Sequence, residues 1–129
     1  MPQVGIVLVS HSVRLAEGAA DLAAQVGGGT VAVVAAGGTD DGGLGTSAAK
    51  VERALRDAER GAGVVVLPDL GSAVLTVRAL LEDLPDVTVV LADAPFVEGA
   101  VAATVTAAAG ADLTAVAKAA EEAWHARKL

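Results

Sequence analysis

Four short apolar runs, separated by segments of helical periodicity, constrain the fold of this chain more than any other feature. The runs are Val4–Val9, Thr30–Ala35, Val64–Leu67 and Val87–Ala92, bounded by Gly, Pro or Asp. They are rich in Val, Leu and Ile and lack the polar alternation of a half-exposed strand. We therefore expect four strands that are buried on both faces.

The segments between these runs carry apolar residues at helical spacing. After the first two runs, the residues predicted to share a buried helix face are Leu15, Ala19, Leu22 and Val26, and then Val51, Ala54, Leu55 and Ala58. A third helix is predicted over Ser72–Leu84, because Pro85 disfavours helical backbone in the residue before it. The rest of the chain predicts two further helices.

The last two helices have recognisable ends. Pro95 can occupy a first helical position, with Gly110 past the end of that helix, and Asp112 can cap a final helix that runs to about Arg127. Strands that alternate with crossover helices form a parallel sheet with helices on both faces. The sequence thus predicts one α/β domain over residues 1–129, a doubly wound, mainly parallel four-stranded sheet of order 2-1-3-4.

Composition excludes several classes of function. The chain of 129 residues has a net charge of -7, which argues against nucleic acid or an anionic membrane surface as the main partner and favours a basic protein partner. It has no cysteine, which excludes thiol nucleophiles and Cys-ligated zinc. No apolar stretch reaches the roughly 20 residues of a membrane span. We read no signal peptide and expect a cytoplasmic protein.

Polar residues are concentrated after the predicted strands. "SHS" follows the first, "GGTDDGGLGTS" the second, "PDLGS" the third and "DAPFVEG" the fourth. Doubly wound sheets bind ligands beyond the carboxyl ends of their strands, where the strand order reverses. With the order 2-1-3-4, His11 and Asp69 follow neighbouring strands and face each other. A carboxylate on one ring nitrogen fixes the tautomer and leaves the other nitrogen as a nucleophile.

Each of these residues also has an ordinary structural interpretation. His11 can be a capping or packing residue, Asp69 a turn residue and Ser72 a helix cap. His125, beside Trp124, is interpreted as a surface residue. The loop from residue 37 to 47 exceeds the roughly 2–6 residues usual for such connections, and its length suggests a function. It lacks the P-loop spacing, and we expect no metal at Asp40, Asp41 or Asp93 and no cofactor.

The motifs "GIVLVSHS", "LAEGAADLA", "AAGGTDDGGLGTS", "DLGSA" and "APFVEGAVAA", in this order, resemble those of the DhaM family. These are the phosphotransfer subunits of phosphoenolpyruvate-dependent dihydroxyacetone kinases, and their fold is that of mannose-type IIA domains of the bacterial sugar phosphotransferase system. The resemblance covers Val4 to about Ala123. The glycine-rich loop together with "SHS" separates this branch from the sugar-transporter branch.

The resemblance implies a phosphocarrier that acts as a phosphotransferase component. The histidine at His11 accepts a phosphoryl group from the histidine protein HPr and passes it to ADP on the nucleotide-binding subunit of the kinase. The resulting ATP phosphorylates dihydroxyacetone on a third subunit. The carboxylate at Asp69 orients the histidine, and the domain is a homodimer. Longer members carry HPr-like and enzyme I-like domains, so we expect this chain to depend on separate phosphotransfer proteins.

Phosphoryl transfer needs donors for the charge on three equatorial oxygens. The candidate phosphate-binding residues are Ser10, Ser12, Gly38, Thr39, Gly71 and Ser72. One residue departs from expectation: Pro68 precedes Asp69 and lacks a backbone donor at the end of a central strand. If it shortens that strand, Asp69 is displaced.

Two alternative functions remain open at this point. One is the IIA component of a mannose-type sugar transporter, which shares the chemistry. The other is a regulatory module that binds an anion or a partner protein and transfers nothing.

Overall fold

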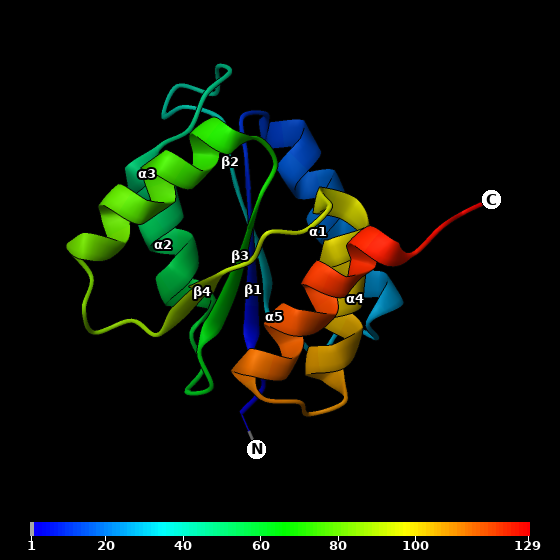
Figure 1. The fold of residues 1–129 in the computed structure, drawn as a ribbon. Helices are drawn as coiled ribbons and strands as arrows, with labels where there is room; N and C mark the ends of the chain where they lie inside the picture. The colour runs from blue at the N-terminus through cyan, green and yellow to red at the C-terminus, as the bar shows by residue number, and fades with distance from the viewer. Residues whose placement is uncertain (1) are drawn as a thin grey trace.

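The computed structural model describes residues 2–129 and contains a four-stranded sheet covered by helices on both faces (Figure 1). Its elements alternate along the chain much as the sequence predicts. In order they are β1 (Gly5–Ser10), α1 (Val13–Val26), β2 (Val33–Gly37), α2 (Ala48–Ala58), β3 (Val64–Pro68), α3 (Gly71–Glu82), β4 (Val89–Leu91), α4 (Phe96–Ala108), α5 (Leu113–Glu122) and the short 3-10 helix η1 (Ala123–His125).

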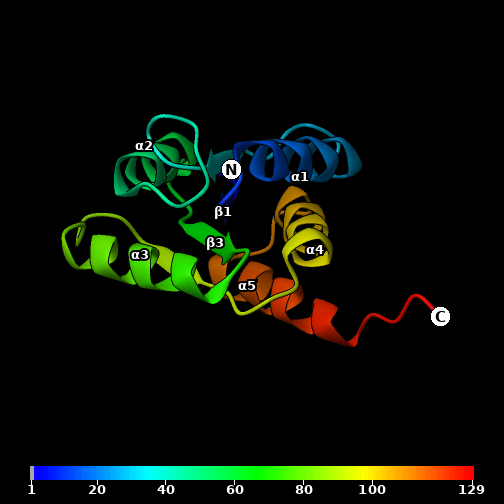
Figure 2. The same cartoon turned by 90° about the horizontal axis from the view of Figure 1, so that it is seen from above.

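All strand pairs of the sheet are parallel, and the order is β2-β1-β3-β4, which confirms the predicted α/β topology. Helices α2 and α3 cover one face, and α1, α4 and α5 cover the other, as the view from above shows (Figure 2). The reversal of strand order lies between β1 and β3. The carboxyl ends of these two strands, where His11 and Asp69 follow, are therefore neighbours.

The core consists of two layers of small aliphatic side chains, one on each side of the sheet. Ile6 and Leu8 of β1 pack with α1, α4 and α5, whereas Val7 and Val9 pack with α2 and α3. All four side chains are fully buried. A strand buried on both faces has no polar alternation, and this is why β1 reads as a continuous apolar run.

Two strands are shorter than predicted because apolar character did not mark their ends. β2 begins at Val33 rather than at Thr30 and ends at Gly37 rather than at Ala35, and Val31 is buried in the core although it precedes the ladder. β4 is limited to Val89–Leu91, since the N–H of Val87 donates to the carbonyl of Leu84 in a turn. Burial of a side chain does not require its backbone to join a sheet.

The predicted face of α1 is buried only at Ala19. Leu15, Leu22 and Val26 are 44%, 48% and 54% exposed, and the buried residues of the helix are Ala16, Ala19, Ala20 and Ala23. Small side chains let α1 lie close to the sheet and to α4. A Cβ built on Gly27 would come within 2.5 Å of Thr104 Cγ2 of α4, which shows how tight this contact is.

Three helix ends also differ from prediction. Ser72 lies inside the first turn of α3 rather than capping it, because α3 begins at Gly71. Pro95 is the residue before α4 rather than its first residue. The Oδ1 atom of Asp112 accepts from the N–H of Ala115 and caps α5 as predicted, but α5 ends at Glu122, short of Arg127.

Pro68 does not displace Asp69. Pro68 is the last residue of β3 and pairs with Val9, and the N–H of Asp69 donates to the carbonyl of Val9 at 2.9 Å. Successive residues of a strand direct their N–H groups to opposite neighbours. The proline nitrogen therefore faces the β4 side, where the ladder ends at the bond from Ala92 to Val66. The missing N–H of Pro68 therefore faces a side on which the sheet forms no further hydrogen bond.

Candidate phosphoryl-transfer site

His11 lies at the carboxyl end of β1, between the strand and α1. Ser10 ends the strand, and Ser12 caps the helix by accepting a hydrogen bond from the N–H of Leu15 at 3.2 Å. The cap fixes where α1 starts, so the backbone at His11 is held from both sides. The histidine side chain is 23% exposed, which leaves its ring accessible from solvent.

Asp69 faces this ring from the end of β3. Its Oδ1 lies 2.9 Å from His11 Nδ1, and its Oδ2 accepts a bond from the backbone N–H of His11 at 3.0 Å. An ionised carboxylate only accepts hydrogen bonds, so the ring proton stands on Nδ1. The structure thus brings together the two residues expected to form the site, and Nε2 is left as the unprotonated ring nitrogen.

The surroundings of Asp69 keep it ionised. Burial raises the pKa of this carboxyl, but hydrogen bonds from the backbone and ring of His11, from the Ser10 hydroxyl and from the backbone N–H of Leu70 outweigh it. The net pKa lies below the ordinary value of 3.8. The bond from Leu70 measures 2.7 Å and the bond from Ser10 2.9 Å. A carboxylate with this many donors holds its charge at neutral pH.

Ser72 stands beside the other ring nitrogen. Its Oγ lies 2.6 Å from His11 Nε2, and with the ring proton on Nδ1 the serine hydroxyl donates to Nε2. Gly71 and Ser72 are the first two residues of α3, so their backbone N–H groups have no intrahelical acceptor. The start of α3 therefore has two backbone N–H groups and one hydroxyl that can donate to an anion.

Three of the predicted phosphate-binding residues are not available as direct donors. The N–H of Gly38 donates to the carbonyl of Ser10, and the N–H of Thr39 donates to the carbonyl of Gly43, each at 3.0 Å. Ser10 is fully buried, and its hydroxyl donates to Asp69. The backbone N–H of Ser12 donates to Ser10 Oγ at 3.0 Å, but the Ser12 hydroxyl, which accepts from the N–H of Leu15, can still donate its own proton. Ser12, Gly71 and Ser72 remain as the predicted residues with a donor outside the local backbone hydrogen bonds, and Ser72 is the one whose side chain contacts the ring.

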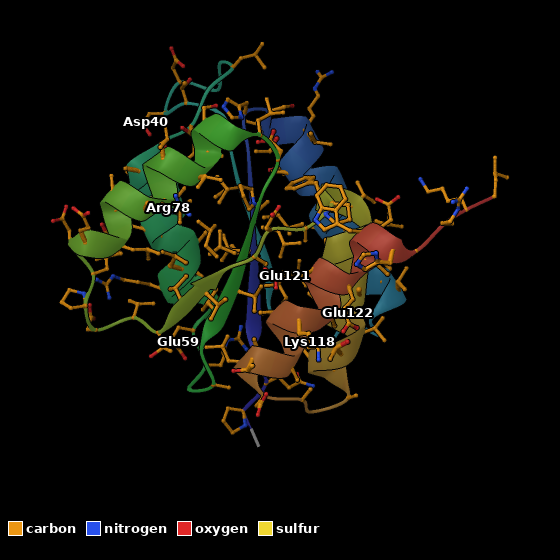
Figure 3. All side chains as sticks on the ribbon, in the orientation of Figure 1. Asp40, Glu59, Arg78, Lys118, Glu121 and Glu122 are labelled. Atoms are coloured by element: carbon orange, nitrogen blue, oxygen red, sulfur yellow. The ribbon has the colours of Figure 1, made fainter. Side chains whose placement is uncertain are left out.

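The glycine-rich loop over residues 38–47 projects from the domain and is held in place by hydrogen bonds, and it does not form an anion-binding concavity. The N–H of Gly45 donates to the carbonyl of His11 at 2.9 Å, and the Thr46 hydroxyl lies 2.8 Å from the Thr76 hydroxyl of α3. Leu44 at its tip is 83% exposed. Asp40, labelled in Figure 3, lies on this loop at the same end of the molecule as the β-strand carboxyl ends.

Sequence reasoning missed two parts of the site, which are the backbone donors to Asp69 and a groove beside this residue. The N–H groups of His11 and Leu70 hold Asp69, and no side-chain pattern signals backbone donors. A groove of about 440 Å³ begins at Asp69 and Gly71 and extends to Phe96 and Trp124. Phe96 and Trp124 are the chain's single Phe and single Trp, and it has no Tyr. This scarcity was the one signal in the sequence for the groove.

Two further features bear on candidate ligands. Within residues 2–129, no three His, Cys, Asp or Glu side chains lie together in a way that could hold a metal ion. Over the same described residues, no helix is long and apolar enough to cross a membrane. His125 lies in η1 and is exposed, as predicted for a surface residue.

Comparison with known proteins places this geometry in a family. Residues 5–117 match the family EIIA-man, described as the PTS system fructose IIA component. The chain belongs to the EIIA-man family. Within this family, the curated relatives it matches are DhaM subunits, so the predicted DhaM resemblance is confirmed.

Two DhaM relatives illustrate the coverage. The phosphoryl donor subunit DhaM of Escherichia coli is 43% identical, over 88% of this chain but only 25% of its own length. DhaM of dihydroxyacetone kinase 2 from Listeria innocua is 37% identical, over 79% of this chain and 84% of its own length. The EIIA-man chain thus spans about a quarter of the first relative and most of the second.

Solved structures agree on the fold. A crystal structure of a protein of unknown function has a TM-score of 0.81 and 31% identity, covering 94% of this chain and 95% of its own. A sigma-54 interaction domain protein from Enterococcus faecalis has a TM-score of 0.68 at 17% identity, covering 90% of this chain and 86% of its own. This second likeness supports only the fold of the EIIA-man chain.

Proposed function

We propose that this chain is a single EIIA-man domain that carries a phosphoryl group on His11 for a dihydroxyacetone kinase. One observation carries the proposal: Asp69 holds Nδ1 of His11 at 2.9 Å, which leaves Nε2 unprotonated, with the Ser72 hydroxyl of α3 as its hydrogen-bond partner. A neutral imidazole with a fixed tautomer, next to anion donors, has the requirements of a phosphoryl acceptor.

The first half-reaction transfers a phosphoryl group from a phosphohistidine donor protein, which we propose is HPr. The electron pair on Nε2 attacks phosphorus in line, the bond from phosphorus to the donor nitrogen breaks, and its electron pair stays on the donor ring. The His11 ring then carries the phosphoryl group on Nε2 and its proton on Nδ1. The Asp69 carboxylate stabilises the positive charge that this ring acquires.

Ser72 has two successive roles in this proposal. In the resting protein its hydroxyl donates to Nε2 at 2.6 Å, and this bond must break before phosphorus can approach. The hydroxyl and the backbone N–H groups of Gly71 and Ser72 then donate to the phosphoryl oxygens. These donors are neutral, and no fixed cation is required to hold the group. A weakly held phosphoryl group is what a carrier that must release it requires.

The second half-reaction passes the group to ADP on the nucleotide-binding subunit of the kinase. An oxygen of the ADP β-phosphate attacks phosphorus, the bond to Nε2 breaks, and its electron pair returns to the ring. Support for this acceptor comes from the relatives, which are phosphoryl donor subunits of dihydroxyacetone kinases. These names favour the kinase over a sugar transporter as the destination of the group.

The partners follow from this scheme. We propose HPr as donor and the nucleotide-binding and dihydroxyacetone-binding subunits of the kinase as the acceptor machinery, with all of them in the cytoplasm. We also propose a homodimer, and the exposed apolar residues Leu15, Leu22 and Val26 of α1 are candidates for its contact. Light scattering of the purified chain gives the oligomeric state directly, and a monomer at micromolar concentration rejects the dimer.

Reconstitution tests the function. The chain is incubated with radiolabelled phosphoenolpyruvate, enzyme I and HPr, and covalent label is measured before and after addition of the ADP-loaded kinase subunit. We expect label on the wild type and on His125→Ala but not on His11→Ala, and we expect the label to leave on ADP addition. An unlabelled wild type supports instead a module that binds without transfer. Label that passes to a sugar-transporter component and not to ADP favours the transporter.

A further inference from the structure

Ser10 lies directly behind the pair formed by His11 and Asp69, and sequence reasoning counted it among residues that touch phosphate. It is fully buried at the end of β1, so no ligand reaches its hydroxyl. Its Oγ donates to Oδ2 of Asp69 at 2.9 Å and accepts the N–H of Ser12 at 3.0 Å. A buried hydroxyl with both of these bonds has a function other than substrate binding.

The direction of the Ser10 bond is determined by its partners. The hydroxyl accepts from the N–H of Ser12, which can only donate, and its own proton points to Asp69, whose ionised carboxylate can only accept. The serine therefore has a single arrangement in which both bonds form. It links the first backbone turn after β1 to the carboxylate at the end of β3.

The four bonds on Asp69 divide evenly between its two oxygens. Oδ1 accepts from the His11 ring and from the N–H of Leu70, and Oδ2 accepts from the N–H of His11 and from the Ser10 hydroxyl. Ser10 supplies the only one of these four donors that is neither backbone nor part of the histidine itself. Without it, Oδ2 keeps one donor, and three hydrogen bonds instead of four restrain the carboxylate plane.

We infer that Ser10 is a positioning residue for phosphoryl transfer, which fixes the plane of the Asp69 carboxylate and through it the tautomer and direction of the His11 ring. The inference rests on the proposed function for its kinetic consequence. Its structural part, the restraint on the bond from Nδ1–H to Oδ1, holds for the protein by itself. Positioning matters because in-line transfer loses up to about 100-fold in rate from a misplacement of about 1 Å.

The test compares Ser10→Ala with Thr104→Val in the full chain. Thr104 is also fully buried, its hydroxyl donates to the carbonyl of Ala100 within α4, and it lies outside the site, so its variant measures the cost of losing a buried hydroxyl alone. Ser10→Cys keeps the approximate volume of serine with a much weaker donor, and it serves if the alanine variant does not fold. Thermal unfolding establishes that each variant is folded at the assay temperature.

Two readouts distinguish positioning from a structural role. In proton NMR, we expect the Nδ1–H resonance of His11, protected by Asp69 in the wild type, to exchange with water at least severalfold faster in Ser10→Ala and Ser10→Cys but not in Thr104→Val. In phosphorylation from HPr, we expect kcat to fall about tenfold or more, with KM for HPr unchanged, in the Ser10 variants alone.

The outcomes separate the inference from the function on which it rests. If the Ser10 variants show the wild-type Nδ1–H exchange rate and the wild-type kcat while their melting temperature falls, Ser10 is structural and the inference is wrong. If the wild type itself is not phosphorylated, the proposed function fails. In that case the exchange rate of the Nδ1–H proton still decides whether Ser10 orients the pair.

Discussion

Asp69 accepts two hydrogen bonds from His11 at once, one from the ring Nδ1 at 2.9 Å and one from the backbone N–H at 3.0 Å. The ring and its own backbone are therefore held by the same carboxylate. This arrangement is possible because β1 and β3 are adjacent and parallel, so the residues that follow them lie side by side. It fixes the side chain of His11 without burying it.

Replacing Asp69 with asparagine tests this double contact. In Asp69→Asn one oxygen becomes an NH₂ group, which either faces the donors at Ser10 and the His11 backbone or faces Nδ1 and moves the ring proton to Nε2. Either arrangement removes the free electron pair or its alignment, so we expect phosphorylation of His11 to slow by about 100-fold or more. Rapid-quench measurement of label uptake from HPr checks this, and a rate within threefold of the wild type, on the order of 1 kcal/mol or less in barrier, contradicts it.

Acid should reduce the stability that Asp69 contributes. Burial raises the pKa of this carboxyl, but the hydrogen bonds from His11, Ser10 and Leu70 lower it more, so the folded pKa lies below 3.8. The unfolded chain then binds this proton at higher pH than the folded chain does. The stabilisation is complete above the unfolded pKa and is lost as the pH falls through the folded pKa.

Urea denaturation measures this effect. The difference in free energy of unfolding between wild type and Asp69→Asn should shrink on acidification below about pH 4, as the pH falls through the folded pKa of Asp69. Other carboxyls titrate in both proteins and cancel in the difference. A difference that grows on acidification means that the carboxyl has a raised pKa, contrary to this account.

The strand order and the neighbouring positions of His11 and Asp69 could be predicted because they follow from chain topology. Short apolar runs between helical segments leave few arrangements, and a parallel sheet brings the ends of adjacent strands to one edge. Asp112 was recognised as a cap because a cap depends on the local sequence. These features need no knowledge of how side chains pack.

What could not be predicted depends on packing and on backbone hydrogen bonds. On α1, larger apolar residues were expected inside, but the small residues Ala16 and Ala23 pack against the sheet and leave Leu22 exposed. Gly38 and Thr39 were expected to bind phosphate, but the N–H of Thr39 donates to the carbonyl of Gly43 instead. Hydrophobicity does not encode the distance between a helix and a sheet, and residue type does not show which backbone donors a turn consumes.

Gly5 provides a test of the close packing between β1 and the end of α2. A Cβ at this position would lie 2.1 Å from the carbonyl oxygen of Ala58 at the end of α2, and a backbone atom cannot move aside as a flexible side chain can. We expect Gly5→Ala to lower the free energy of unfolding by about 1–3 kcal/mol or more, measured by urea denaturation.

Gly18 is the matched control for that substitution. It lies on the exposed side of α1, and a Cβ there meets nothing within 4 Å. Since alanine favours helix over glycine, Gly18→Ala should raise the free energy of unfolding by roughly 0.5–1 kcal/mol. If both variants shift in the same direction, the effect comes from the glycine backbone in general and not from the contact with Ala58.

Electrostatic steering of a basic partner should depend on the acidic loop beside His11. Asp40 lies on this loop, whereas Glu122 lies on α5 away from it (Figure 3), and the chain has a net charge of -7. We expect kcat/KM for phosphorylation by HPr to fall as salt rises from about 0.05 M to about 0.5 M, because exposed charges are screened within about 10 Å near 0.1 M.

Asp40→Asn should flatten this dependence, and Glu122→Gln, which removes the same charge elsewhere, should leave it unchanged. Equal salt slopes for the two variants would mean that net charge, and not the loop, attracts the partner.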